Sequence, residues 1–257
     1  MLEPRIIPCL LLMGAGLVKG IKFKDHRYVG DPINAVQIFN SKEADEILFL
    51  DITATLENRK ISTELIQRVA DQCLIPFGVG GGIQSIQDAR SILNAGAEKV
   101  CLNTAALERP ELIREIADTF GSQSVIVSID VKKSYLGKYE VYVRSGTKKI
   151  SGSIEQVLDV IQSQGAGEVI INSIDRDGTR EGYDLNLIRR CSDKMKIPLI
   201  ALGGAGSVDD LSQAIIGGGA DAVAAGSLFV FHGRRRGVLI SYLSEEERGQ
   251  FRRAIHS

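Results

Sequence analysis

Tryptophan is absent from this chain of 257 residues, and histidine occurs only three times, at His26, His232 and His256. These histidines lie far apart, and none has the short spacing that is typical of paired metal ligands. The sequence also lacks the glycine fingerprint of dinucleotide-binding proteins and the nucleophile elbow of α/β-hydrolases. We therefore expect no metal ion and no bound cofactor.

Cysteine is also scarce, with four residues that form no C-x-x-C pair: Cys9, Cys73, Cys101 and Cys191. Three of them lie in apolar runs, which favours reduced, structural cysteines in the cytoplasm. A long hydrophobic run is missing as well. The apolar stretch that follows Arg5 has about eight residues, well short of the roughly 18 that cross a bilayer, so we interpret it as a buried strand rather than a signal peptide.

Neither sign of charge prevails, because 31 Lys and Arg residues nearly balance 32 Asp and Glu residues. This balance argues against a general surface for nucleic acid or membranes, and it leaves local anion sites open. The chain is 44% hydrophobic and 25% charged. Its length and composition fit one large α/β domain over residues 1–257 better than two small domains.

Short runs of Val, Ile and Leu alternate with stretches of helical period, a pattern typical of parallel strands covered by helices. The predicted strands are Ile6–Leu11, Glu46–Ile52, Phe77–Val79, Lys99–Leu102, Val125–Asp130, Glu168–Asn172, Leu199–Leu202 and Ala222–Ala225. The predicted helices are Pro32–Lys42, Ser62–Gln72, Ile86–Asn94, Pro110–Phe120, Ile154–Gln164, Leu185–Lys194, Asp209–Gly217 and Glu245–Ala254. Eight such units without a linker predict a single (βα)8 TIM barrel, with an open doubly wound α/β sheet as the alternative.

The chain also repeats itself at an offset of nearly half its length. Residues 75–83 resemble residues 197–206 at an offset of 122, and residues 95–100 resemble residues 218–223 at an offset of 123. A barrel built from two (βα)4 halves explains both matches. The repeat also places Leu11, at the end of the first strand, opposite Asp130, at the end of the fifth.

Glycine-rich turns follow the third and seventh predicted strands, and each turn precedes a helix. Backbone N–H groups at such turns can bind a phosphate, although one copy alone is equally consistent with a tight turn. The predicted phosphate-binding residues are Gly81, Gly82, Asn103 and Thr104 in the first half, and Gly203, Gly204, Gly226 and Ser227 in the second. Together they predict a ligand with a phosphate at each end, stretched across the barrel mouth.

Charged residues near the strand ends are candidates for chemistry. Asp130 ends an apolar strand, where a buried carboxylate is costly without a role, so we predict it to be the general acid or base. Asp51 holds the same kind of position and is equally consistent with fixing a loop. Asp177 and Gly178 either contact the substrate or simply form a turn. Lys19, in the loop after the first strand, is either a mobile lid residue over the substrate or a solvated lysine.

Long, ordered motifs over nearly the whole chain identify a family. They lie at residues 5–10, 30–32, 49–54, 79–83, 103–106, 120–123, 173–179 and 203–206. With these motifs the chain resembles the cyclase subunit of imidazole glycerol phosphate synthase. The resemblance implies a barrel that forms a heterodimer with a glutaminase subunit, which docks on its N-terminal face and supplies ammonia. It also implies an ammonia gate of four charged residues at the strand starts: Arg5, Glu46, Lys99 and Glu168.

The sequence departs from this family at a catalytic position. The resemblance implies two catalytic aspartates, at the ends of the first and fifth strands, and here the first of them is Leu11 while the second is Asp130. Leucine can neither donate nor accept a proton, so cyclisation by two carboxylates is in doubt. Asn172 and Leu202 also replace small hydroxyl residues that face the ligand, which predicts a changed substrate.

Such a combination is similar to cyclase paralogues that accompany sugar amidation in the synthesis of surface polysaccharides such as O-antigen. The chain would then be a lyase- or cyclase-type subunit that passes ammonia to a phosphorylated or nucleotide-linked sugar, with a sugar amidotransferase as a second candidate partner. A genuine cyclase of histidine biosynthesis is the first alternative. A non-catalytic scaffold that channels ammonia is the second.

Overall fold

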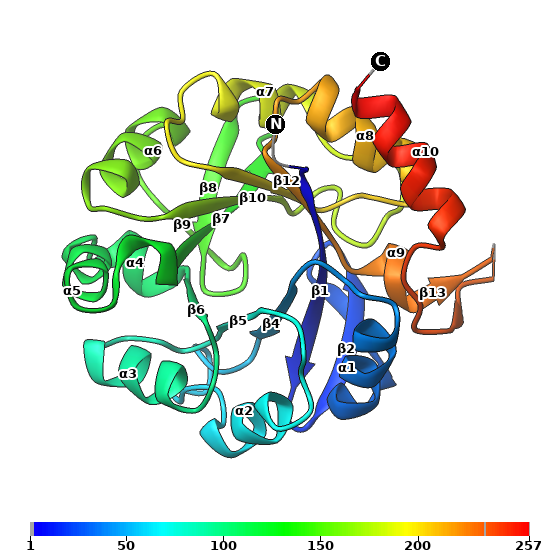
Figure 1. The fold of residues 1–257 in the computed structure, drawn as a ribbon. Helices are drawn as coiled ribbons and strands as arrows, with labels where there is room; N and C mark the ends of the chain where they lie inside the picture. Colours follow the sequence, from blue (N-terminus) through cyan, green and yellow to red (C-terminus); the bar gives the residue numbers. More distant parts are fainter. Residues whose placement is uncertain (1–2, 234, 257) are drawn as a thin grey trace.

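A closed ring of parallel strands forms the centre of the molecule in a computed structural model, which describes residues 3–233 and 235–256. Around the ring lie β1 (Arg5–Met13), β4 (Ile47–Asp51), β5 (Phe77–Gly80), β6 (Lys99–Leu102), β7 (Val125–Lys133), β10 (Glu168–Ser173), β11 (Leu199–Leu202) and β12 (Ala222–Ala225). The ring is closed because β10 pairs with both β7 and β11, and β12 pairs with β1 (Figure 1). The predicted (βα)8 TIM barrel is confirmed, and the alternative of an open sheet is wrong.

Helices surround this ring on the outside (Figure 1). They are α1 (Pro32–Ser41), α2 (Thr63–Ala70), α3 (Ile86–Asn94), α5 (Glu111–Phe120), α6 (Ile154–Ser163), α7 (Leu185–Ser192), α8 (Val208–Ile216) and α10 (Glu245–Ile255). Each lies within two residues of its predicted ends. The sequence predicted where these helices start because a polar capping residue precedes most of them. The side chain of Asp31, for example, accepts hydrogen bonds from the N–H groups in the first turn of α1.

The two halves of the barrel repeat structural details as well as sequence. Ser85 caps α3 and accepts a hydrogen bond from the N–H of Asp88, and Ser207 caps α8 and accepts one from the N–H of Asp210. A short helix follows the next strand in each half: α4 (Thr104–Glu108) and α9 (Ser227–Val230). These matches support the predicted pair of (βα)4 halves.

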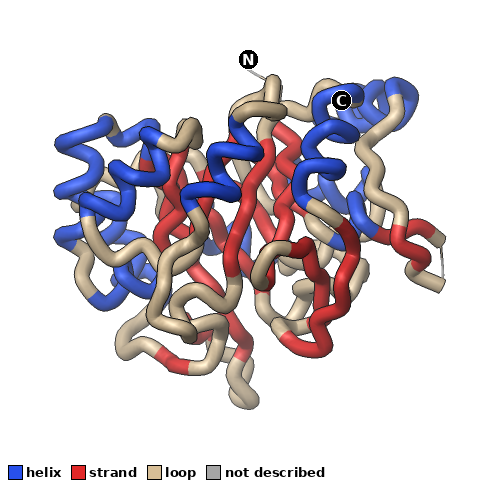
Figure 2. Tube along the Cα trace, turned by 90° about the horizontal axis from the view of Figure 1, so that it is seen from below, coloured by secondary structure: helices blue, strands red, loops and turns tan. Residues whose placement is uncertain are grey.

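Antiparallel hairpins that the sequence pattern did not predict extend the barrel. The first follows β1 and consists of β2 (Gly16–Ile21) and β3 (Lys24–Gly30). The second follows β7 and consists of β8 (Tyr139–Val143) and β9 (Lys148–Lys149). The third pairs β13 (Phe231–His232) with β14 (Gly237–Val238). Figure 2 shows both chain ends where the barrel strands begin and the longest loops at the opposite end. The first two hairpins thus stand at the carboxyl ends of the strands, where barrels of this type carry their sites.

Two apolar layers stabilise the barrel, one between strands and helices and one inside the ring. The outer layer includes the fully buried Phe39, Phe49 and Phe229, each worth about 2 kcal/mol by burial alone. The inner layer consists mainly of Ile7, Leu48, Ile126, Ile170 and Ile200. Within the described residues, no helix is both long and apolar enough to span a membrane. The four cysteines are free thiols.

Candidate functional site

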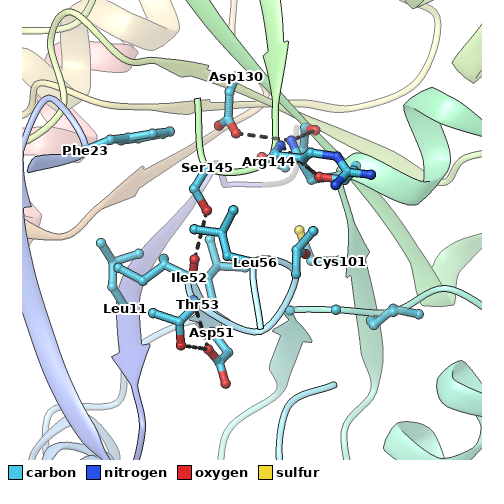
Figure 3. Close-up of a pocket in the computed structure, with 18 of the residues that line it drawn as sticks. Leu11, Phe23, Asp51, Ile52, Thr53, Leu56, Cys101, Asp130, Arg144 and Ser145 are labelled. Atoms are coloured by element: carbon cyan, nitrogen blue, oxygen red, sulfur yellow. Dashed lines mark hydrogen bonds between the residues drawn. The ribbon is translucent and has the colours of Figure 1, made fainter. Parts of the chain in front are cut away.

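A cavity of about 630 Å³ opens at the carboxyl ends of the barrel strands. Its wall combines the ends of β1, β4, β5, β6 and β7 with residues from the first two hairpins, such as Phe23 and Ser145. Figure 3 shows Asp130 and Leu11 on different sides of this space. Side chains from both halves of the barrel therefore face one shared cavity.

Asp130, the predicted general acid or base, is buried near the end of β7 and lines the cavity. Its Oδ1 accepts a hydrogen bond of 2.9 Å from Nδ2 of Asn172, and its Oδ2 accepts one of 3.2 Å from Nδ2 of Asn103. Burial raises the pKa of Asp130 to about 7, while the two amide donors act in the opposite direction. A carboxyl group with this pKa can donate or accept a proton near neutral pH.

The first glycine turn, at the end of β5, opens directly into the cavity. Gly81 and Gly82 line the cavity together with Asn103 and Thr104 from the end of β6. Gly82 has a φ of 68°, and a Cβ there would lie 1.9 Å from the carbonyl oxygen of Arg59, so only glycine fits. The structure thus gathers four predicted phosphate-binding residues at one end of the cavity.

Two arginines that the sequence pattern did not single out stand beside this turn. Arg109 and Arg144 line the cavity, and the backbone N–H of Arg144 donates a 3.0 Å hydrogen bond to Oγ1 of Thr104. Glu108 is shared between Lys148 at 2.7 Å and Arg144 at 3.5 Å, and the hydrogen bond from Lys148 lowers the pKa of Glu108. Arg109 is paired with Glu115 at 3.1 Å, so three cations share two glutamates and this end of the cavity has an excess of positive charge.

The second glycine turn differs from the first. Among the described residues, Gly226 and Asp177 reach the cavity, whereas the following predicted phosphate-binding residues lie outside its lining: Gly178, Gly203, Gly204 and Ser227. Lys19 lies over Gly226, since a Cβ added to this glycine would be 3.1 Å from Cε of the lysine. The predicted phosphate-binding residues of the first half therefore line the cavity, whereas most of those of the second half lie outside it.

The sequence analysis left two interpretations of Lys19 open, a lid residue in a mobile loop and a solvated lysine. The structure instead places it in a strand, where it is buried. It belongs to β2, its exposed fraction is 6%, and its Nζ lies 2.5 Å from Oδ1 of Asp177. The physical reason is the register of the hairpin, which pairs Leu11 with Val18 and so folds the chain back onto the barrel mouth. Oδ2 of Asp177 has no hydrogen-bond partner within the described part of the chain.

Asp51 lines the cavity, but its hydrogen bonds hold a loop. Its Oδ1 accepts hydrogen bonds of 3.1 Å from the N–H groups of Thr53 and Ala54, and Nη1 of Arg59 lies 2.5 Å from its Oδ2. The bond to Asp51 also raises the pKa of Arg59. Of the two interpretations left open for Asp51, this geometry favours the loop-fixing one.

Four charged side chains close the opposite end of the barrel in a ring. Arg5 donates to the carboxylates of Glu46 and Glu168, at 2.7 Å in the second case. Nζ of Lys99 lies 3.0 Å from Glu46 and 3.3 Å from Glu168. Burial lowers the pKa of Arg5, but its two glutamate partners raise it overall. Each glutamate thus joins both cations, which lets the four charges lie at the barrel floor together.

The barrel interior between this ring and the cavity is apolar. It contains Ile7, Leu48, Ile126, Ile170, Ile200 and Ala222. Cys9 and Cys101 lie where this interior meets the cavity, and burial raises the pKa of Cys9 to about 12 and that of Cys101 further. Both thiols are therefore protonated and neutral near pH 7.

The chain matches the family described as "Histidine biosynthesis protein" over residues 5–235. It belongs to this family. It is 49% identical over 242 residues to the "Putative imidazole glycerol phosphate synthase subunit hisF2" of Pseudomonas aeruginosa. These aligned residues cover 94% of this chain and 96% of that relative. It is 47% identical over 249 residues to the "Putative imidazole glycerol phosphate synthase subunit HisF" of Leptospira interrogans, covering 96% and 98% of the two chains.

A third member of the family is the "Imidazole glycerol phosphate synthase subunit HisF" of Alkaliphilus metalliredigens, with 44% identity over 232 residues, or 90% of this chain and 92% of that one. The resemblance seen in the sequence motifs is thereby confirmed. The HisF-type relatives support a chain of the synthase or cyclase type.

The end of β1 carries Leu11 where the resemblance implies an aspartate. Leu11 is paired in register with Leu50 on β4, and both side chains line the cavity and pack against the apolar interior. Leu202, at the end of β11, lines the same wall. Where the resemblance implies an aspartate and a hydroxyl group, this member of the family has a continuous apolar surface.

Two further features of this histidine biosynthesis family member were not visible in its sequence. Asn172 donates its hydrogen bond to Asp130 and lies outside the cavity lining, so it acts on the carboxylate and not directly on a ligand. Ser145 Oγ donates a 2.8 Å hydrogen bond to the carbonyl of Ile52, which ties the second hairpin across the cavity (Figure 3). Both contacts join segments far apart in the sequence, so no local pattern signals them.

Proposed function

We propose that this chain is the ammonia-using subunit of a two-component glutamine amidotransferase and that it serves the amidation of a sugar in surface-polysaccharide synthesis. The observation that carries the proposal is the combination of Leu11 with Asp130: one carboxylate of the family's pair is lost, and the other is held by two amide donors. A site with a single proton-transferring carboxyl suits nitrogen transfer to an activated sugar better than cyclisation by two carboxylates.

The ammonia comes from a glutaminase subunit that docks on the end of the barrel closed by the ring of Arg5, Glu46, Lys99 and Glu168. Movement of Lys99 away from its glutamates would open this ring. The apolar interior behind the ring favours neutral ammonia over the ammonium ion, because burying an unpaired charge costs several kcal/mol or more. These features support delivery of ammonia from below the barrel to the cavity.

In the cavity, the substrate's phosphate lies at the first glycine turn, near Gly81, Gly82 and Thr104. The ammonia nitrogen adds to an electrophilic carbon of the substrate. Asp130 accepts a proton from the added nitrogen or gives one to the departing oxygen, and its pKa of about 7 makes both forms available. Phosphate roles for Gly203, Gly204, Gly226 and Ser227 stay predictions from the sequence repeat, and substrate contact by Gly178 stays a prediction from its turn.

The names of the relatives support the first alternative, a cyclase of histidine biosynthesis, because they describe subunits of imidazole glycerol phosphate synthase. A direct comparison of substrates separates the two functions. The chain is purified together with its glutaminase, and product formation is measured with glutamine or with ammonium chloride on the family's ribonucleotide substrate and on an activated nucleotide-linked sugar. We expect nitrogen transfer to the sugar, and turnover of the ribonucleotide at the rate of a cyclase would overturn the sugar assignment.

The second alternative, a scaffold that only channels ammonia, requires a separate test on the same complex. Asp130→Asn keeps the shape of the side chain, so a scaffold would keep full product formation. Lys99→Ala should leave transfer from added ammonium chloride intact and uncouple it from glutamine hydrolysis. If Asp130→Asn leaves product formation unchanged, the chain is not catalytic and the scaffold replaces the proposed function.

A further inference from the structure

We propose that His26, on the first hairpin, is the second proton-transferring group of the cavity and takes over the task of the carboxylate that is missing at Leu11. The neutral imidazole removes a proton from the added nitrogen, and Asp130 protonates the departing oxygen. This inference rests on the proposed function, since it concerns the same nitrogen transfer, and it adds a catalytic residue to that reaction.

The fold of the first hairpin brings His26 to the cavity. His26 belongs to β3 and lines the cavity together with Lys19 from β2 and Phe23 from the turn between these strands. Its ring lies close to Gly20, since a Cβ added to this glycine would be 2.9 Å from Cδ2 of His26 and 2.1 Å from the carbonyl oxygen of Lys24. Only glycine leaves this space, so the backbone of β2 fixes the place of the imidazole.

The turn of the same hairpin is anchored to other loops at the barrel mouth. The N–H of Lys22 donates a 2.9 Å hydrogen bond to the carbonyl of Asp177. Phe23 lies against the second hairpin, where a Cβ added to Gly146 would be 3.0 Å from its ring. Figure 3 shows Phe23 and Asp130 at the same cavity. His26 is therefore carried by a hairpin that is held at both ends.

The imidazole of His26 is available to a bound substrate. The residue is partly exposed, and among the described residues its ring makes no hydrogen bond and no ion pair. A neutral imidazole has one N–H donor and one acceptor nitrogen. The acceptor nitrogen can therefore take a proton from a group in the cavity without first giving up a partner in the protein.

The surrounding charges suit His26 as a base and Asp130 as an acid. Burial lowers the pKa of His26 from its ordinary value of 6.5, and the cation of Lys19 lowers it as well, against the opposite effects of Asp177 and Asp25. Burial raises the pKa of Asp130 to about 7, and Asp177 raises it too. Asp177 is thus within electrostatic reach of both groups. Near pH 7 the imidazole is mainly neutral while the carboxyl group still carries a proton in part of the molecules.

The two groups divide the proton transfers between them. Ammonia forms a bond to the electrophilic carbon of the substrate as the bond from this carbon to the departing oxygen breaks. The nitrogen then loses one proton to the acceptor nitrogen of His26, and the oxygen gains the proton of Asp130. The imidazolium releases its proton to water at the exposed side of the ring, and the carboxylate takes one up. One proton leaves the nitrogen and one reaches the oxygen, so the reaction balances.

The test is the pH dependence of nitrogen transfer by the complex with its glutaminase. Rates are measured with ammonium chloride, referred to free ammonia at each pH, on whichever acceptor the complex converts, the sugar or the ribonucleotide. We expect a bell-shaped profile. Its acidic limb falls below pH 6.5, as His26 is protonated, and its alkaline limb falls above about pH 7, as Asp130 loses its proton.

Substitution of the histidine assigns the acidic limb. His26→Gln should lower the maximal rate about 10²-fold and remove the acidic limb, because glutamine does not titrate. The control His232→Gln changes an exposed histidine on β13, outside the cavity lining, and should alter neither the rate nor the profile. A rate in His26→Gln within about threefold of the unmodified chain, or an acidic limb that persists, would overturn the proposal.

A second variant separates loss of the imidazole from damage to the hairpin. His26→Ala leaves a space beside Gly20, and free imidazole added to the reaction should restore its rate by at least about tenfold. The same addition should not restore Asp130→Asn. Failure of imidazole to restore His26→Ala would show that the side chain acts only on the shape of the hairpin, and it would overturn the proposal.

The inference and the proposed function can fail separately. If the complex converts only the ribonucleotide and His26→Gln removes the acidic limb, the sugar assignment is wrong and the role of His26 stands. If nitrogen is transferred to the sugar and His26→Gln leaves rate and profile unchanged, the proposed function stands and the role of His26 is wrong. If neither Asp130→Asn nor His26→Gln changes product formation, both proposals are wrong.

Discussion

The two halves of the barrel mouth have kept complementary parts of a duplicated site. The first half has an open glycine turn at Gly81 and Gly82, but its first strand ends in Leu11. The second half has the buried carboxyl of Asp130, but its glycine turn at Gly203 and Gly204 lies outside the cavity lining. Under the proposed function the site is therefore composite, with the anion anchor from one half and the proton-transferring group from the other.

The floor of the barrel differs from the mouth, because there both halves contribute to one ring of charges but only the glutamates repeat. Glu46 and Glu168 are separated by the repeat offset of 122, and each carboxylate is paired with both Arg5 and Lys99. A closed ring of four charges needs every member, since an unpaired charge at this depth is costly. The two halves therefore differ at the floor as well, since both cations, Arg5 and Lys99, come from the first half.

The largest effect is expected from exchanging the acid at the mouth. Asp130→Asn should lower nitrogen transfer about 10²- to 10⁴-fold, because an amide cannot carry a proton. Leu11→Asn, the matched change at the equivalent strand end, should alter the rate by less than about threefold, since no proton passes there. Both rates are measured with saturating ammonium chloride on the complex.

An equal loss in these two variants would break the comparison, because it would show that both strand ends act in the reaction. Far-UV circular dichroism serves as the control for folding. The spectrum should be retained in both variants, since each change replaces a single side chain and leaves the strand backbone unaltered.

The next effect concerns the floor, where replacing either glutamate leaves the two cations with one partner. Glu46→Gln should lower the free energy of unfolding by about 3 kcal/mol, as expected when one member of a buried ion pair is removed. Glu168→Gln should cost less, because 13% of the Glu168 side chain is exposed compared with 3% for Glu46. Urea denaturation at pH 7 measures both, and a larger loss for Glu168→Gln would contradict the ranking by burial.

A smaller effect follows from the raised pKa of Asp130, which burial moves from 3.8 to about 7. Between these values the folded chain holds a proton that the unfolded chain has released, so stability falls as pH rises. This group alone should lower the free energy of unfolding by about 1.4 kcal/mol from pH 5 to pH 6. Asp130→Asn removes that slope, and parallel stability curves for the two proteins would rule out a raised pKa.

The sequence predicted the barrel and the first half of the site because local patterns encode them. The Val- and Ile-rich strands, the serine caps and the three consecutive glycines at 80–82 each have a direct structural meaning. The pairing of the four floor charges was also expected, though through the family resemblance and not through spacing.

What the sequence did not predict depends on long-range contacts. Strand β3 has no apolar alternation, since five of its seven residues are at least partly exposed polar side chains, so only its pairing with β2 makes it a strand. The burial of Lys19 requires Asp177, which is 158 residues away along the chain. Arg144 reaches the cavity through a hairpin whose turn has positive φ angles at Arg144 and Ser145, residues that rarely signal such a turn.

The smallest expected effect tests whether the halves remain equal away from the mouth. Asp88 lies in the first turn of α3, and its Oδ2 accepts a 3.2 Å hydrogen bond from the N–H of Gln84. Asp210 lies in the first turn of α8, and its Oδ2 accepts hydrogen bonds of 2.9 Å from the N–H groups of Gly206 and Ser207. Asp210→Ala should therefore cost about 1 kcal/mol of unfolding free energy, and Asp88→Ala somewhat less. Urea denaturation of the two variants measures this difference. A clearly larger loss for Asp88→Ala would show that the halves have diverged in the helical layer as well as at the mouth.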